Sequence, residues 1–291
     1  MKSRIRNIHK PNKNLITKST IQPSIITTSL SPPNTACICA IAKYEDLYID
    51  EWIKYNLHIG FNAIYLYDNS DEFTLKNINS KYPGKVFVKH YPGPKKQIEV
   101  YNSFGTNPEY RKLYKWCAFI DCDEFIVLKK YLFKDNKPSI IDFLNEYCNS
   151  STYSAICLNW YLFGFNGEKE YRPEYVTKRF TTRESKGSEF IKVIVKLSDF
   201  IRTSTPHDAI TLKGTRSTDG RILRNSFNKN PNMDIAYINH YFCKSEGEFN
   251  NKMSRGRATT TLKRTIETYK QEYGIKDDMT TVDLTLYNIK F

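Results

Sequence analysis

The segment that most constrains the fold is an apolar run that ends abruptly in three carboxylates. Residues Trp116–Ile120 have the character of a buried strand, Asp121–Glu124 (sequence DCDE) follow at once, and the apolar run resumes at Phe125. Two aspartates at positions i and i+2 of a turn present oxygens near one point, and oxygen ligands suit magnesium and manganese. A metal held by two side chains keeps positions open for a substrate phosphate. The alternative is that Asp121 and Asp123 only cap a turn.

Strands and helices alternate before this cluster. The apolar runs 37–42, 61–67 and 86–88 indicate strands, and residues 45–59 place four apolar side chains on one helical face, with Gly60 as the stop. Short apolar strands in a strand–helix–strand order predict a mostly parallel sheet covered by helices. Ligands bind at the carboxyl ends of the strands in such sheets, so we expect the site at that edge.

A further strand is predicted at residues 190–197. Ile191, Val193, Val195 and Leu197 alternate there with Lys192, Ile194 and Lys196. The alternation predicts one mostly polar face, and we expect this strand to extend the sheet in a mixed arrangement.

Composition predicts one large domain with tails. At 291 residues and 40% hydrophobic content, the chain can bury one sizeable core. Residues 1–35 are basic, rich in Ser, Thr, Pro and Asn, and free of acids, so we predict a disordered tail there. The domain is then expected at 36–273, followed by a C-terminal tail at 274–291. The net charge of +13 suits polyanionic partners, namely nucleic acid, an anionic membrane surface or nucleotide phosphates.

The seven cysteines favour a reducing compartment, because their number is odd and several lie in apolar runs, as core residues do. No apolar run approaches the length of a membrane span, and no secretory segment is apparent. These features predict a cytoplasmic protein or one peripheral to the cytosolic side, with the basic tail available for membrane contact.

A basic, metal-dependent nuclease or nucleic-acid-binding protein is the alternative class. The charge and the acidic cluster would suit it, but the acids form one tight cluster instead of the dispersed set that a two-metal site needs. We therefore do not expect nucleic acid as the partner.

Several motifs, in their order and spacing, make the chain similar to the GT-A nucleotide-sugar glycosyltransferases, and in particular to glycosyltransferase family 92 and its relatives in family 2. The matching stretches are Ala40–Glu45, Glu51–Gly60, Tyr67–Ser70, Gln97–Asn102, Lys115–Phe125, Trp160–Gly167, Asn239–Ser245 and Lys252–Gly256. The resemblance implies a GT-A, Rossmann-like domain, a UDP-sugar donor, a Mn²⁺ or Mg²⁺ ion, and a saccharide or glycoconjugate acceptor.

The metal is assigned by the resemblance to Asp121 and Asp123. His240, which follows the apolar run 235–239, is the expected third ligand, and His207 is its competitor. The ordinary role of a lone histidine beside aromatic residues is structural.

The donor is assigned to residues along the same edge. They are Ala42, Glu45, Asp68, Gln97, Asn102, Cys122, Lys244, Lys252 and Arg255. Asp68 is expected to accept hydrogen bonds from the base or ribose, although Asp-Asn-Ser equally suits a turn. Lys252 and Arg255 share a helix face and would neutralise the diphosphate leaving group, the alternative being a solvated face. Ser245 and Glu248 match a capping box.

The acceptor is assigned to the aromatic, glycine-rich segment that begins at Trp160. Trp160, Phe163, Gly164 and His207 are the expected acceptor-binding residues. The resemblance also implies inversion, for which one carboxylate must deprotonate the acceptor hydroxyl. The candidates for this base are Glu168, then Asp208, then Glu184.

Overall fold

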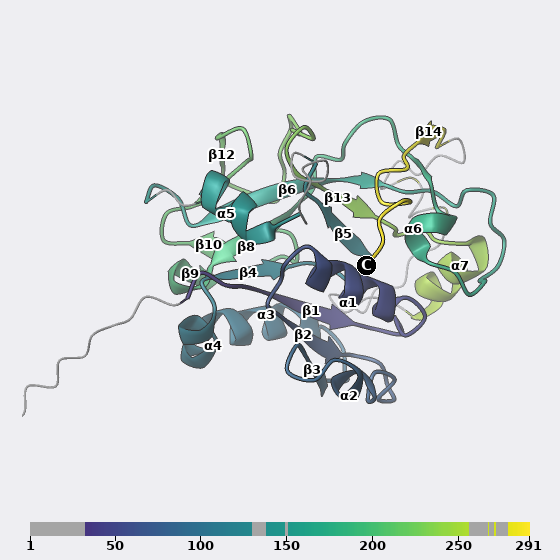
Figure 1. The fold of residues 1–291 in the computed structure, drawn as a ribbon, viewed down its shortest axis with the longest axis horizontal. Coiled ribbons are helices and arrows are strands. Elements are labelled where there is room, and N and C mark those ends of the chain that lie inside the picture. The colour runs from purple at the N-terminus through teal and green to yellow at the C-terminus, as the bar shows by residue number, and fades with distance from the viewer. Residues whose placement is uncertain (1–32, 130–137, 149–150, 256–266, 268–270, 272–278) are drawn as a thin grey trace, which may run out of the picture. The chain divides into compact units, whose positions relative to one another are not determined.

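The computed structural model describes residues 33–129, 138–148, 151–255, 267, 271 and 279–291. They belong to one compact unit, Pro32–Phe291, built around a mixed, mainly parallel sheet flanked by helices (Figure 1). The predicted α/β class is therefore confirmed. The predicted tail lies outside the described residues, apart from positions 33–35.

Strands and helices alternate in the first half of the chain, as the sequence predicted. The strands are β1 Ala36–Ala42, β2 Ala63–Asp68, β3 Val86–His90, β4 Trp116–Phe119, β5 Glu124–Val127, β6 Ala155–Leu162, β7 Thr182–Arg183, β8 Ile191–Lys196, β9 Phe200–Arg202, β10 Ile210–Thr211, β11 Thr215–Arg216, β12 Ile222–Leu223, β13 Tyr237–His240 and β14 Thr281–Val282. The helices are α1 Ile49–His58, α2 Ile78–Lys81, α3 Lys96–Thr106, α4 Pro108–Leu113, α5 Ile140–Cys148, α6 Val176–Arg179 and α7 Glu246–Arg255, with a 3₁₀ turn η1 at Leu197–Asp199.

The main sheet has the strand order β12-β11-β6-β8-β4-β1-β2-β3. Strands β4, β1, β2 and β3 are mutually parallel, whereas β8 runs antiparallel to both β4 and β6. Strand β13 pairs in parallel with β6 and antiparallel with β5. The carboxyl ends of β4, β6 and β13 therefore gather around the turn that joins β4 to β5.

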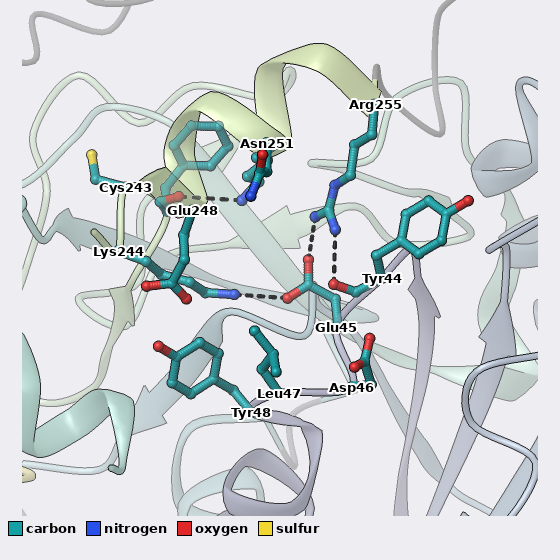
Figure 2. Close-up of a pocket in the computed structure, with 12 residues that line it drawn as sticks. Tyr44, Glu45, Asp46, Leu47, Tyr48, Cys243, Lys244, Glu248, Asn251 and Arg255 are labelled. Atoms are coloured by element: carbon teal, nitrogen blue, oxygen red, sulfur yellow. Dashed lines mark hydrogen bonds and ion pairs between the residues drawn. The ribbon is translucent and has the colours of Figure 1, made fainter. Parts of the chain in front are cut away.

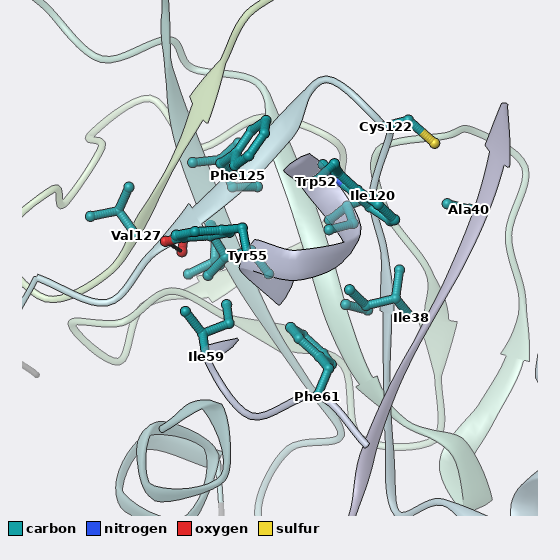
Figure 3. Close-up of a cluster of buried hydrophobic side chains, with 14 of the residues drawn as sticks. Ile38, Ala40, Trp52, Tyr55, Ile59, Phe61, Ile120, Cys122, Phe125 and Val127 are labelled. Carbon is teal, nitrogen blue, oxygen red and sulfur yellow. Dashed lines mark hydrogen bonds between the residues drawn. The ribbon is translucent and has the colours of Figure 1, made fainter. Parts of the chain in front are cut away.

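Strand β1 is buried on both faces of the sheet, which explains its continuous apolar character. Its alternate residues Ile38 and Ala40 pack with Trp52 and Tyr55 of α1 on one face (Figure 3). Cys37, Cys39 and Ile41 face the opposite side, where Val100, Tyr101 and Phe104 of α3 cover them. Helix α1 ends just before Gly60, whose φ of 99° lets the chain reverse, as the sequence predicted.

One prediction about β8, its mostly polar face, is wrong. Its mixed pairing is as expected, but the polar face is not, because Lys192 is 1% exposed in the middle of the sheet. The alternation of apolar residues and lysines was misleading since the Lys192 ammonium is paired with Asp121 and the buried Glu124 instead of with solvent.

The C-terminal residues 279–291 pack on the domain. Strand β14 pairs with β7, Leu286 is buried, and the Phe291 ring stacks on Tyr175. The domain therefore continues beyond the expected boundary at residue 273.

All seven cysteines are free and buried, in agreement with the expectation that they are small core residues. Within the described ranges, no helix combines the length and the apolar character needed to cross a membrane.

Candidate functional site

Asp121 lies in the turn between β4 and β5, at the carboxyl edge where the sequence placed it. Gln97 Nε2, from the first turn of α3, donates to Asp121 Oδ1 at 2.8 Å. Lys192 Nζ, from β8, donates to Asp121 Oδ2 at 2.7 Å. The Asp121 carboxylate is therefore held by side chains of two different elements, α3 and β8.

Asp123 faces two other groups. Its Oδ2 accepts from Lys252 Nζ of α7 at 2.5 Å, and its Oδ1 lies 3.4 Å from His240 Nε2. Burial opposes the ionised form, but Lys252 and His240 outweigh it and hold the pKa of Asp123 well below its usual range. Asp123 is therefore a carboxylate at neutral pH, as a cation ligand must be.

His240 is brought to the acidic turn by the pairing of β13. It is in register with Glu124 of β5 on one side and with Leu162 of β6 on the other. Its ring packs edge-on against Trp160, and its Nδ1 is a buried atom without a hydrogen-bond partner among the residues that the structure describes. The ring is thus fixed by packing with Nε2 directed toward Asp123.

Glu124 and Lys192 form the buried support of the turn. Glu124 Oε2 accepts from the Asp121 N–H at 2.9 Å and lies 3.5 Å from Lys192 Nζ. Burial raises the pKa of Glu124 to about 7. Burial alone would lower the pKa of Lys192, but Asp121 and Glu124 outweigh it and raise that pKa. The sequence analysis missed Lys192 as a site residue, although a lysine inside an apolar strand was a usable signal.

A pocket of about 360 Å³ opens beside this turn, between residues 44–48 and α7. Figure 2 shows Glu45 between two cations, Lys244 and Arg255. Lys244 Nζ lies 2.8 Å from Glu45 Oε2, and Arg255 Nη2 lies 2.6 Å from Glu45 Oε1. Burial opposes ionisation of Glu45, but Lys244 and Arg255 outweigh it and lower its pKa. Four of the predicted donor residues therefore line one pocket, namely Glu45, Lys244, Lys252 and Arg255.

The pocket wall contains two strained backbone positions. Tyr44 and Lys244 both have a positive φ, 53° and 54°, which is uncommon for residues other than glycine. Such strain concentrates at functional sites, where the surrounding contacts maintain it. The Tyr44 N–H is held by Ser70 Oγ at 2.9 Å, and the Tyr44 ring is 38% exposed.

The other predicted donor residues have structural contacts. Asp68 is fully buried, and it accepts hydrogen bonds from the Ser70 N–H, Thr74 Oγ1 and the Leu75 N–H. These are the contacts of the turn interpretation. Asn102 exchanges two hydrogen bonds with the Thr203 backbone. Donor binding by Asp68 and Asn102 stays a prediction.

Two small residues lie beside the site. Ala42 ends β1, and its carbonyl accepts from the Asn69 N–H at 2.6 Å. Cys122, which separates the two aspartates in the sequence, has a buried side chain whose Sγ lies 3.9 Å from the Ile41 carbonyl oxygen. Their donor roles also stay predictions.

The aromatic residues expected to bind the acceptor are buried, and acceptor binding by them stays a prediction. Trp160 is 2% exposed and Phe163 is 1% exposed, so these side chains belong to the core and do not present an open face to a sugar. Phe163 packs on Tyr241 with ring centroids 4.5 Å apart. The Gly164 N–H donates to the Thr182 carbonyl, and a Cβ there would meet Met279. Segments far along the chain cover these aromatic side chains, so the sequence pattern could not reveal their burial.

His207 packs between Trp160 and Phe190, with ring centroids 5.6 and 5.3 Å away. Burial lowers its pKa to about 3, so the imidazole is neutral. Lys192, Asp121 and His240 are the other charges that act on it. His207 thus lies near the acidic turn, but it is His240 that contacts Asp123.

The candidate bases differ in their contacts. Glu168 accepts from Arg172 and Arg179, and those arginines lower its pKa. Asp208 accepts from Thr205 Oγ1 at 2.9 Å and from Ser226 Oγ at 2.7 Å.

The structure assembles the predicted metal ligands in part. Among the described residues, no three His, Cys, Asp or Glu side chains are gathered as a ready ligand set. Asp123 Oδ1 and His240 Nε2 are nevertheless 3.4 Å apart, and ligand atoms about 2.1 Å from an octahedral ion lie about 3 Å from each other. The two groups fit one Mn²⁺ or Mg²⁺ ion, whereas the Asp121 oxygens contact Gln97 and Lys192.

The fold and the site define an α/β protein that has an acidic turn, a histidine and the basic last turn of a helix at one edge of a mixed sheet. Comparison with known families then shows that the chain belongs to glycosyltransferase family 92, whose family model matches residues 33–276.

Similar curated proteins carry the same family name. A glycosyltransferase family 92 protein of Ricinus communis is 26% identical over 153 residues, which are 52% of this chain and 27% of that protein. A second match to a Ricinus communis protein of that name is 27% identical over 158 residues, 50% of this chain and 26% of the relative. An Oryza sativa subsp. japonica family 92 protein is 24% identical over 151 residues, 52% of this chain and 25% of the relative. The matches thus span about a quarter of the relatives' length.

Proposed function

We propose that this chain is a metal-dependent glycosyltransferase, which moves a sugar from a UDP-sugar to a hydroxyl group of a saccharide or glycoconjugate. Family membership supports sugar transfer over the nuclease alternative. The observation that carries the proposal is the convergence of three cations, Lys244, Lys252 and Arg255, on the Glu45 and Asp123 carboxylates at one pocket. Membrane contact through the basic tail stays a prediction.

The three cations suit a diphosphate. Lys252 and Arg255 lie on one face of α7, and Lys244 lies just before that helix. Each is within 2.8 Å of a carboxylate oxygen, so each ammonium or guanidinium group is directed into the site. Charge-assisted hydrogen bonds from such groups would stabilise the negative charge that develops on the leaving diphosphate.

Asp123 and His240 would hold the Mn²⁺ or Mg²⁺ ion, with Asp121 as the third predicted ligand. When bound, such an ion screens the charge of the diphosphate. The chain's own residues prepare the site: Lys192 and Gln97 orient Asp121, and ring packing orients His240. Inversion at the anomeric carbon is part of the proposal and rests on the family resemblance alone.

The first test is calorimetric titration of UDP with and without Mn²⁺. We expect UDP to bind the wild-type chain only with Mn²⁺, and this binding to disappear in Asp123→Asn and His240→Gln. Asp142→Asn, which changes an exposed acid on α5, is the matched control and should bind as the wild type does.

Turnover follows with UDP-glucose, UDP-galactose, UDP-N-acetylglucosamine and GDP-mannose. Hydrolysis of one UDP-sugar, with the anomeric configuration of the product read by NMR, would support the donor class and decide inversion. If no nucleotide binds with metal, while RNA or DNA binds with a steep salt dependence, the proposal fails.

A further inference from the structure

Glu184 is a half-buried acid fixed at the carboxyl end of β6. The Leu162 N–H donates to Glu184 Oε1 at 2.9 Å, and the Glu184 N–H donates to the Leu162 carbonyl at 3.0 Å. Backbone and carboxyl group are thus both held by the same residue. A side chain fixed in this way is oriented before any substrate binds.

The position of Leu162 places Glu184 beside the proposed metal and diphosphate site. Leu162 is paired in register with His240 of β13, and His240 Nε2 lies 3.4 Å from Asp123 Oδ1. Burial raises the pKa of Glu184 to about 7, and His240 and Arg183 are the nearby charges that oppose this rise. The effect of His240 on the pKa of Glu184 agrees with the register of β13 and β6, which pairs His240 with Leu162.

The second carboxyl oxygen of Glu184 is accessible. Among the described residues, no group donates a hydrogen bond to Glu184 Oε2, and this oxygen is not buried. The other two candidates differ, because Glu168 is paired with Arg172 and Arg179 and both Asp208 oxygens accept from hydroxyls. Glu184 alone of the three combines a fixed oxygen with one open to an incoming hydroxyl.

We propose that Glu184 is the catalytic base of the sugar transfer, an inference that rests on the function proposed above. Glu184 Oε2 takes the proton of the acceptor hydroxyl as the hydroxyl oxygen uses an electron pair to bond the anomeric carbon. The bond from that carbon to the diphosphate oxygen breaks, and its electron pair leaves on the diphosphate. A base with a pKa near neutrality suits this proton transfer.

Glu184→Gln tests the proposal, because the glutamine carbonyl can still accept from the Leu162 N–H but cannot take a proton. The assay is UDP release from the UDP-sugar that the wild type turns over fastest, with Mn²⁺ present and water as the acceptor. We expect kcat to fall at least about 100-fold, while the KM for the donor and the affinity for UDP stay unchanged. Glu189→Gln, an exposed acid on the same segment, is the matched control and should keep the wild-type kcat.

Each other outcome overturns the proposal in a distinguishable way. If Glu184→Gln keeps a kcat within threefold of the wild type, Glu184 is not the base, and the proposed function stands. If the variant loses UDP affinity or its urea midpoint together with turnover, the role of Glu184 is structural. If the wild-type chain neither binds UDP nor turns over any donor, the proposed function fails and the assignment of Glu184 fails with it.

Discussion

At the scale of single residues, Lys192 shows how the acidic turn is maintained. A lysine in the interior of a sheet is costly unless its charge is paired. Its Nζ lies 2.7 Å from Asp121 Oδ2 and 3.5 Å from Glu124 Oε2, so one ammonium balances two carboxyl groups. The turn is therefore stable only when β8 contributes its lysine.

We expect Lys192→Met to destabilise the protein by about 3–5 kcal/mol, because it leaves a buried acid without its counter-charge. Lys196→Met on the same strand removes a partly exposed lysine 3.9 Å from Asp199 and should cost under about 1 kcal/mol. Urea unfolding measures both changes. Equal losses in the two variants would show that the Lys192 charge is not needed.

The ion pair of Lys192 could not be predicted from the sequence. The apolar run before Asp121 and the turn after it are local features, so the sequence could predict them. Asp121, the partner of Lys192, lies 71 positions away, just past the end of the neighbouring strand β4, and alternation along β8 holds no information about it. The burial of Trp160 could not be predicted for a similar reason, because it depends on Phe190 and His207.

At the scale of elements, α7 is attached to the domain by charge. Lys252 and Arg255 reach Asp123 and Glu45 from its last turn, and Ser245 caps its first turn with Glu248, as the sequence predicted. Arg179 of α6 is fully buried and contacts both Glu248 Oε2, at 3.3 Å, and Glu168 Oε2, at 3.1 Å. The position of α7, and with it the cationic side of the pocket, therefore depends on α6.

We expect Arg179→Met to lower the free energy of unfolding by about 3–5 kcal/mol, since two acids lose a buried partner. Arg172→Met is the matched control, because Arg172 also pairs with Glu168 but is 51% exposed, and it should cost under about 1 kcal/mol. Chemical denaturation compares the two. A cost for Arg179→Met as small as that of the control would mean that α7 is positioned by other contacts.

At the scale of the whole molecule, the C-terminal segment completes the domain. Arg183 Nε lies 2.6 Å from Asp283 Oδ2, and Phe291 packs against both Tyr55 and Tyr175. The sequence placed a tail here since the segment has little helical periodicity. Its stability comes from contacts with α1, α6 and β7, which no local pattern reveals.

We expect Leu286→Ala to destabilise the protein by about 2–5 kcal/mol, because Leu286 is buried and its loss leaves a cavity. Leu284→Ala, two positions away at a side chain 48% exposed, should change stability by less than about 0.5 kcal/mol. Thermal unfolding of both variants checks this. A loss equal to the control would show that the segment is separable from the domain.

The seven buried thiols give this architecture an internal set of probes. Cys122, Cys148 and Cys243 lie on the face of the sheet that α1 covers, whereas Cys37, Cys39, Cys117 and Cys157 lie on the face that α3 covers. Burial raises the pKa of thiols such as Cys39 and Cys122, so alkylation requires the chain to open. Pulsed alkylation read by mass spectrometry would therefore report, without any engineered label, which face of the sheet separates first when the domain unfolds.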